Sequence, residues 1–138
     1  MASRLNPYIS YVHNARQALE FYKDVFGGTL ALNTFGEAGA QHSPDDAEKI
    51  MHGMLQTDSG YTLMAADTPA GMEHHPGNNI AMSLSGDDAD ELHGYWEKLS
   101  TSGTVTMPME KQMWGDEFGM CVDKFGIGWM VNIGAPSA

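Results

Sequence analysis

Apolar residues recur at helical spacing in two segments of the chain. In residues 15–26, and again between Asp88 and Ser102, they repeat at i, i+3, i+4 and i+7, which predicts two amphipathic helices. The apolar stripes consist of Ala15, Ala18, Leu19, Tyr22 and Phe26 and of Leu92, Tyr95, Trp96 and Leu99. Asn14 and either Asp87 or Asp88 are suited to cap the helix N-termini, because short polar side chains accept hydrogen bonds from the first free amides.

Shorter apolar or alternating segments flank both helices and predict strands. They are residues 7–12, 29–35, 50–56 and 61–66 in the first half, and 80–85, 104–107 and a hairpin over 117–133 in the second. Each half is therefore predicted to run strand, helix, strand, strand, strand. Residues 36–49 are polar and turn-rich, which predicts a long loop with one helical turn at Pro44–Lys49. Asp67 closes a strand and is predicted to cap the turn that follows it.

The second half of the chain repeats the first. FGMCVDKFGIGWM (118–130) aligns without a gap on HGMLQTDSGYTLM (52–64), with two glycines and two methionines identical. The hairpins superpose with an offset of 66 and the helices with an offset of 73, and the long loop after Phe35 can hold the seven additional residues. We therefore predict an α+β fold, one domain over 1–138. It comprises a first βαβββ module (6–67), a linker (68–77) and a second module (78–134).

Composition narrows the classes of function. The 138-residue chain has 18 acidic and 7 basic residues and a formal net charge of −11. This field repels phosphate backbones, so we expect no nucleic-acid partner, whereas a cationic ligand would be attracted. No stretch approaches the roughly 20 apolar residues of a membrane span, and the N-terminus has no apolar signal-peptide core, so a cytoplasmic protein is expected. Cys121, the one cysteine, lies among apolar residues, which indicates an inert buried thiol.

Two runs of sequence carry a resemblance to a known family. NAR-x-ALEFYK-x-VFGG and WG-x-x-FGM-x-x-DKFG-x-x-WMVN, with further segments between Asn6 and Asn132, resemble the PhnB-like branch of the vicinal oxygen chelate superfamily, which includes glyoxalase I, bleomycin resistance proteins and extradiol dioxygenases. The resemblance implies sheets that curl around a cup, helices on the outer face and a homodimer. Many PhnB-like sequences are labelled methyltransferases, but Gly27-Gly28 follows a helix, the wrong order for a Rossmann-type cofactor turn. We therefore reject that label.

The resemblance also implies where a divalent metal would be held in catalytic relatives. It places the four ligands at about Pro7, Met64, Asn79 and Met130. Proline offers no side-chain donor, and thioethers suit Cu(I) rather than Zn, Ni, Mn or Fe(II). We therefore predict that the metal centre of the family is absent and that the protein has no cofactor.

His52 is the best single candidate for a chemical role. It lies within a predicted strand, and if Met54 and Gln56 share its face, all three line the cup near Met64. Such a histidine could act as a hydrogen-bonding group or general base, although a purely structural histidine is the alternative. His74 and His75 are adjacent, so on an extended strand they point to opposite faces, and solvated loop histidines are expected.

A methionine- and tryptophan-rich segment is the main candidate for ligand binding. Met107–Met109 and Gln112–Gly115 are predicted to form a loop in which Trp114 and flexible thioethers make an adaptable apolar lid. The predicted ligand-binding residues are Trp114, Met64, Asn79, Met130, Met54 and Tyr11.

The favoured function is the binding of a small organic molecule by a homodimeric protein without the family metal. An antibiotic-sequestering resistance protein is one alternative. Another is a lyase, isomerase or dioxygenase-type enzyme, either metal-dependent or using His52 as a base. An interaction protein whose cup is filled by its own side chains is a further possibility.

Overall fold

A computed structural model describes residues 3–39 and 42–135. The chain divides into two compact units, Met1–Pro76 (unit 1) and Gly77–Ala138 (unit 2), which are described separately below. Among the described residues, no helix is both long and apolar enough to cross a membrane.

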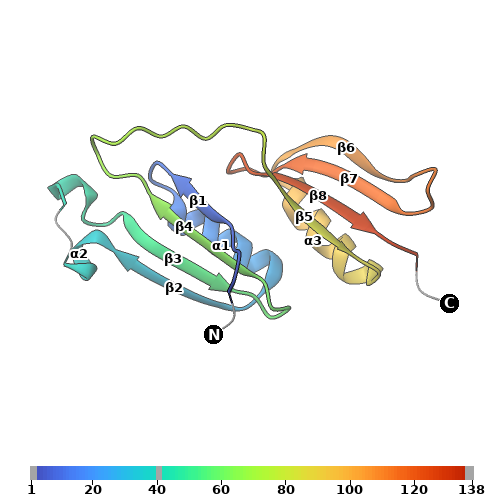
Figure 1. Cartoon of the computed structure of the whole chain (residues 1–138), viewed down its shortest axis with the longest axis horizontal. Coiled ribbons are helices and arrows are strands. Elements are labelled where there is room, and N and C mark those ends of the chain that lie inside the picture. Colours follow the sequence, from blue (N-terminus) through green and yellow to red (C-terminus); the bar gives the residue numbers. More distant parts are fainter. Residues whose placement is uncertain (1–2, 40–41, 136–138) are drawn as a thin grey trace. The chain divides into compact units, whose positions relative to one another are not determined.

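Unit 1 contains a four-stranded mixed sheet with one long helix on one face (Figure 1). Its elements are β1 (Tyr8–Tyr11), α1 (Ala15–Phe26), β2 (Thr29–Thr34), α2 (Phe35–Ala38), a 3₁₀ turn (Pro44–Asp46), β3 (Ile50–Gln56) and β4 (Thr62–Asp67). The strand order is β1-β4-β3-β2, with β1 parallel to β4 and the other pairs antiparallel.

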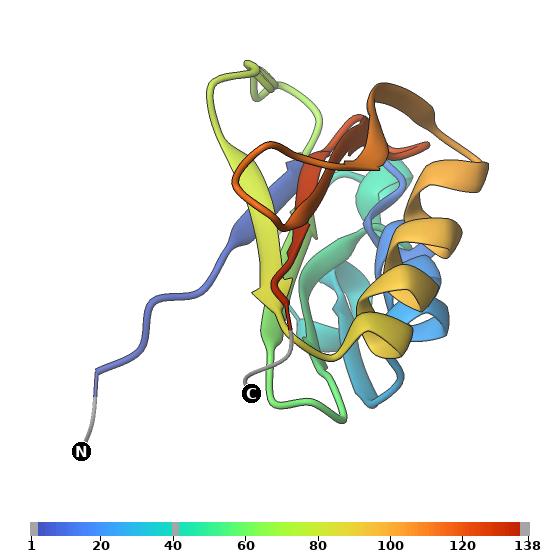
Figure 2. The same cartoon turned by 90° about the vertical axis from the view of Figure 1, so that its right-hand side faces the viewer.

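Unit 2 repeats this arrangement. It comprises β5 (Ala81–Gly86), α3 (Ala89–Thr101), β6 (Thr104–Lys111), β7 (Glu117–Val122) and β8 (Gly128–Ile133). The strand order is β5-β8-β7-β6, with β5 parallel to β8, and Figure 2 shows α3 on one side of its own sheet. The predicted α+β fold of two βαβββ modules is confirmed.

The residues that are identical between the two hairpins have structural reasons for the identity. Gly53 and Gly119 face the helices, and a Cβ on Gly53 would lie 2.5 Å from Leu19 Cδ1 while one on Gly119 would lie 2.8 Å from a Trp96 ring carbon. Glycine at both places therefore lets the helix pack close to the sheet without displacing these side chains. The turn glycines have φ of 96° at position 60 and 89° at position 126, a region that side chains disfavour.

The start of α1 is held by a residue distant in sequence. Asn14 occupies the predicted N-cap position, but its side chain makes no capping hydrogen bond. Instead the buried Asp67 carboxylate accepts the Ala15 amide at 2.9 Å through one oxygen and the Ile50 amide at 2.8 Å through the other. The structural role predicted for Asp67 is thus displaced from the following turn to the helix. In unit 2 the cap is local, because Asp88 accepts the Glu91 amide at 3.1 Å.

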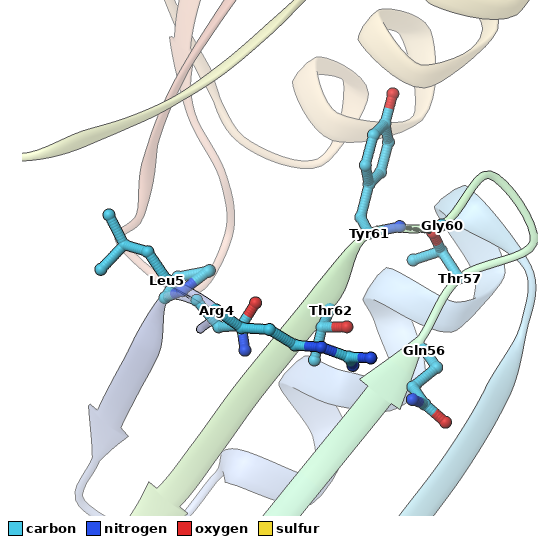
Figure 3. A pocket seen from close by; sticks show the side chains of 9 residues that line it. Arg4, Leu5, Gln56, Thr57, Gly60, Tyr61 and Thr62 are labelled. Atoms are coloured by element: carbon cyan, nitrogen blue, oxygen red, sulfur yellow. Dashed lines mark hydrogen bonds between the residues drawn. The ribbon is translucent and has the colours of Figure 1, made fainter. Parts of the chain in front are cut away.

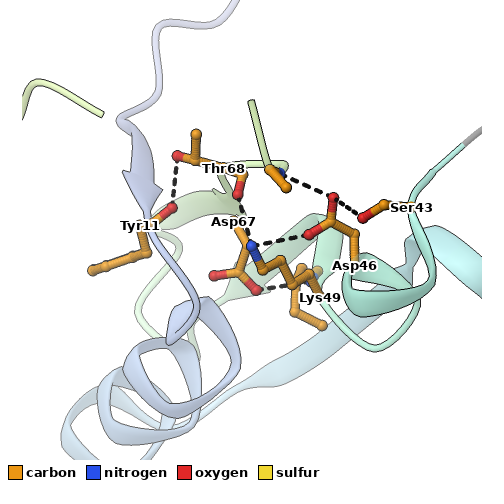
Figure 4. Close-up of polar contacts among 8 residues, drawn as sticks. Tyr11, Ser43, Asp46, Lys49, Asp67 and Thr68 are labelled. Atoms are coloured by element: carbon orange, nitrogen blue, oxygen red, sulfur yellow. Dashed lines mark hydrogen bonds and ion pairs between the residues drawn. The ribbon is translucent and has the colours of Figure 1, made fainter. Parts of the chain in front are cut away.

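A polar cluster fastens the long loop of unit 1 to the segment that leaves β4 (Figure 4). The buried Asp46 carboxylate accepts the Ala70 amide at 2.9 Å and the Ser43 hydroxyl at 3.0 Å, and lies 3.0 Å from Lys49 Nζ. Lys49 also donates to the Thr68 carbonyl at 3.1 Å. The Ala70 amide, followed by Lys49, lowers the pKa of Asp46 below its ordinary value, so this carboxylate stays charged at neutral pH.

Two segments differ from the sequence prediction. The loop expected at Met107–Met109 is part of the edge strand β6, where Pro108 is tolerated because the outer amides need no partner and the pairing with β7 is irregular. The loop expected at 36–49 begins with the short helix α2. Its N-cap is a capping box in which Glu37 N donates to Thr34 Oγ1 at 3.0 Å and Thr34 N donates to Glu37 Oε1 at 3.4 Å.

Candidate functional site

Each sheet has one face covered by its own helix and one face without a helix, here called the open face. In unit 1 the residues that face α1 are buried, including Gly53, Leu55 and Leu63. Strand alternation places their neighbours on the other side. The open face of unit 1 therefore carries Tyr8, His52, Met54, Gln56 and Met64.

Met54 and Met64 form the centre of the open face of unit 1. They are directly opposite each other on β3 and β4, and both are half-buried. Tyr8 pairs with Met64 from the other side, and its ring centroid is 5.8 Å from that of His52. Two thioethers thus lie beside an aromatic ring and an imidazole, a surface that can adapt its shape to an apolar molecule.

Tyr8 is a residue of this face that the sequence analysis missed, and Tyr11 is the residue named in its place. Tyr11 points to the helix side, is 4% exposed, and has its hydroxyl 3.4 Å from that of Tyr22. Tyr11 is therefore not part of the open face. The two tyrosines are three positions apart on one strand, so alternation requires them to point to opposite faces. That spacing was the available signal.

The open face of unit 2 has the same methionine pair in different surroundings. Met120 and Met130 are directly opposite on β7 and β8, and Ser83 pairs with Met130 from β5. Phe118 occupies the place that His52 has in unit 1, because the strand pairings match with an offset of 66.

Trp114 lies at the end of this face, in the turn that joins β6 to β7. The turn is closed by Gln112 N donating to the Asp116 carbonyl at 2.7 Å. The Trp114 ring packs edge-on against Phe118, with centroids 6.3 Å apart, while 60% of the side chain remains exposed. Asp116 also accepts the side-chain amide of Asn132 at 3.0 Å. Trp114 is therefore placed to contact a molecule that covers Phe118.

Asn79 lies outside the strands. It is exposed and precedes β5 by two positions. The pairing of Ser83 with Met130 matches that of Tyr8 with Met64, so the counterpart of Pro7 is Met82. The helix offset of 73 misplaced it because the first strands of the two units match with an offset of 75, from Tyr8 to Ser83.

The donor set does not fit the divalent metal of the family. On the open faces Tyr8 pairs with Met64 and Ser83 pairs with Met130, while Met82 lies one position along β5 and points to the helix side. Pro7 has no side-chain donor, and neither thioethers nor these hydroxyl groups are the imidazole or carboxylate ligands that such a metal requires. Among the described residues, no group of three His, Cys, Asp or Glu side chains is arranged to hold a metal ion. We therefore derive no chemical step through a metal.

Three other histidines, His74, His75 and His93, have separate polar partners. His74 Nε2 is 2.9 Å from the Ser10 carbonyl oxygen, and His75 Nε2 is 2.7 Å from Glu73 Oε2 on an exposed segment. His93 on α3 is 3.2 Å from a Glu117 oxygen. These partners are consistent with surface and connecting roles.

Comparison with known proteins identifies the family. Residues 4–131 match the Glyoxalase/Bleomycin resistance protein/Dioxygenase superfamily, and the chain belongs to that superfamily. It is similar to protein YjdN of Escherichia coli, with 28% identity over 141 residues that cover 94% of each chain.

Solved structures share this fold. Protein PA1353 from Pseudomonas aeruginosa superposes with a TM-score of 0.86 at 32% identity, over 98% of this chain and 100% of that one. A Bacillus cereus PhnB protein, described as a putative 3-demethylubiquinone-9 3-methyltransferase, superposes with a TM-score of 0.77 over 95% of this chain and 99% of that one. Its identity to this chain is 16%, so the likeness concerns the fold alone.

Proposed function

We propose that the protein binds a small organic molecule noncovalently on the open faces of its sheets and does so without the divalent metal of its family. The observation that carries the proposal is the methionine pair that recurs in register in both units, Met54 with Met64 and Met120 with Met130. The superfamily resemblance expects metal ligands at two of these places. Thioethers there favour contact with an apolar molecule instead.

The size of the apolar contribution indicates what kind of ligand would be held. Covering roughly 200 Å² of apolar surface contributes about 5 kcal/mol at about 25 cal/mol per Å². Association costs of a similar size oppose it. An apolar face alone therefore holds a ligand weakly, and additional polar contacts are needed for tight or selective binding.

A neutral apolar fluorophore, N-phenyl-1-naphthylamine, tests the proposal. We expect saturable fluorescence enhancement on addition of the protein and a binding constant about three- to tenfold weaker in Met64→Ala, since the substitution removes apolar contact worth about 1 kcal/mol. Met72→Ala is the matched control, because Met72 lies outside both open faces and is 67% exposed. No saturable enhancement, or an equal effect of the two substitutions, would contradict the proposal.

His52 supports a second candidate, metal-independent lyase or isomerase chemistry. Its imidazole lies on the open face beside the Tyr8 ring and next to Met54, within reach of a molecule bound there. The test is turnover of a small molecule that binds to the open face. Turnover that persists in the presence of a chelator, and that is lost in His52→Ala but retained in His93→Ala, would establish this role. Binding of the same molecule without turnover, unchanged by His52→Ala, would rule it out.

A homodimer and a cytoplasmic location stay predictions from the sequence. The dimer predicts a molar mass of about twice 15.0 kDa in light scattering, and a monomer across the micromolar range would contradict it.

A further inference from the structure

A cleft of about 740 Å³ continues the open face of unit 1 toward the N-terminal segment. Its floor includes Gln56 and Thr62, which are opposite each other on β3 and β4, one step along from Met54 and Met64. Residues 4–7 form another wall. Figure 3 shows the Arg4 side chain extending from that segment toward Gln56, with Thr62 between them in the view. The apolar surface around Met54 and Met64 is therefore continuous with a polar cleft.

The polar end of this surface is made of hydrogen-bond donors. Arg4 is the one charged residue that lines the cleft. Within the described part of the chain, no hydrogen bond or ion pair engages the side chains of Arg4, Gln56 or Thr62. Asp58 is near in sequence, but its carboxylate lies beside Gly27 and Asp58 is not one of the lining residues.

Arg4 is a local positive charge in a largely acidic chain, which has 18 acidic and 7 basic residues. The guanidinium fork matches a carboxylate or phosphate in geometry, and amide and hydroxyl donors beside it add directed contacts. The overall charge favours a cationic ligand, but the local field at a contact distance is set by the nearest group, because salt screens charges beyond about 8–10 Å.

We propose that Arg4, Gln56 and Thr62 bind the anionic group, a carboxylate or a phosphate, of a small organic molecule whose apolar part lies on Met54 and Met64. This inference rests on the proposed function for its apolar part and specifies the class of ligand: an amphipathic organic anion.

Three probes of similar ring size test the inference: benzoate, phenyl phosphate and neutral benzyl alcohol. Each is titrated into isotope-labelled protein at constant ionic strength while the Thr62 backbone amide and the Gln56 side-chain amide are followed by NMR. We expect saturable shifts at both groups with one or both anions, and binding at least about tenfold weaker for benzyl alcohol, as expected for loss of a charge-assisted contact. The stronger of the two anions identifies the ligand group.

Substitutions assign the effect to Arg4. Arg4→Gln is expected to weaken anion binding about tenfold, and Arg4→Lys should restore part of it because the charge returns without the fork. Arg16→Gln, an identical charge change on the exposed side of α1, is the matched control and should leave binding unchanged. Equal losses in Arg4→Gln and Arg16→Gln would indicate a general charge effect and overturn the inference.

The two proposals fail in different ways. If neither anion shifts Gln56 or Thr62 while the neutral naphthylamine binds, the inference is wrong and the proposed function stands. If an anion binds at Arg4 but the naphthylamine does not respond to Met64→Ala, the anion contact is real and the apolar face is not the binding surface.

Discussion

The two units of this protein share one topology but fasten it with different residues. In unit 1 the buried Asp67 accepts amides from the start of α1 and from the start of β3. The position that matches Asp67 in unit 2 is Ile133, which is buried and apolar, and α3 is capped by its own neighbour Asp88. A helix start can therefore be satisfied by a distant carboxylate or by an adjacent one without a change of fold.

The hairpin turns of the two units are also held by different residues, but here the more extensive contacts are in unit 2. In unit 1 the Thr57 hydroxyl accepts the Tyr61 amide at 2.9 Å. In unit 2 Asp123 stands in that place, accepting the Ile127 amide at 3.1 Å and also the Trp129 indole N–H at 2.8 Å. Here unit 2 holds the more extensive buried network, because its strand carries Trp129 where unit 1 has Leu63.

The open faces differ around a shared centre. Both keep the methionine pair, but unit 1 adds Tyr8 and His52 where unit 2 has Ser83 and Phe118. The shared methionine pair offers the same apolar contact to a ligand in both units. The different neighbouring side chains allow the two open faces to bind a ligand with different affinity.

The largest effect is expected from Asp67→Ala. It leaves two buried amides without an acceptor, which costs about 3 kcal/mol of unfolding free energy or more, a large part of a typical total. Urea denaturation measures the loss, and hydrogen exchange at the Ala15 and Ile50 amides locates it. Asp88→Ala, the cap substitution in unit 2, should cost only about 1 kcal/mol. Equal losses of unfolding free energy in Asp67→Ala and Asp88→Ala would contradict the larger contribution expected from the distant cap.

Asp123→Ala should be the next most costly change. It removes the acceptor of a buried indole N–H as well as turn amides, so we expect a loss of about 2 kcal/mol. The matched substitution Thr57→Ala removes fewer contacts and should cost about 1 kcal/mol. Chemical denaturation followed by tryptophan fluorescence compares them. A larger cost for Thr57→Ala would contradict the proposed difference between the turns.

The smallest effect concerns Cys121, whose counterpart in unit 1 is Leu55. Burial, with a smaller contribution from the Asp123 charge, raises the pKa of the Cys121 thiol to about 11 from an ordinary value of 9.0. The folded state thus favours the protonated thiol. The contribution of this preference to the unfolding free energy is complete below pH 9 and falls as the pH rises toward 11.

A comparison with Cys121→Leu, which installs the residue of unit 1, measures this contribution. The wild-type protein should lose stability relative to the variant between pH 9 and 11 in urea denaturation. At pH 8 the thiol should resist alkylation until the protein unfolds. Rapid alkylation of the native protein would show that the thiol is accessible.

Periodicity in the sequence predicted much of this fold for a physical reason. Amphipathic spacing predicted both helices, and the gap-free repeat predicted two matching hairpins. The structure added their register, which places Met54 opposite Met64 and Met120 opposite Met130. Local hydrogen-bonding chemistry also predicted a cap at Asp87 or Asp88, and the structure has it at Asp88. These features depend on residues close together in the chain.

Features that depend on distant or irregular contacts were missed. The cap on α1 comes from Asp67, 52 residues from Ala15, and no local pattern indicates it. The length of β6 was underestimated because Pro108 suggests a break, whereas the outer edge of a sheet tolerates it. The cleft at Arg4 depends on where the N-terminal segment lies, which side-chain periodicity does not determine.

The most direct test of the central claim follows the methionine methyl groups by NMR. Protein labelled at methionine methyls is titrated with the neutral naphthylamine, and Met54, Met64, Met120 and Met130 are compared with Met72, which is 67% exposed and lies outside the open faces. We predict saturable shifts at one or both opposed pairs and none at Met72. Unchanged pairs, or a shift at Met72 alone, would contradict binding on the open faces.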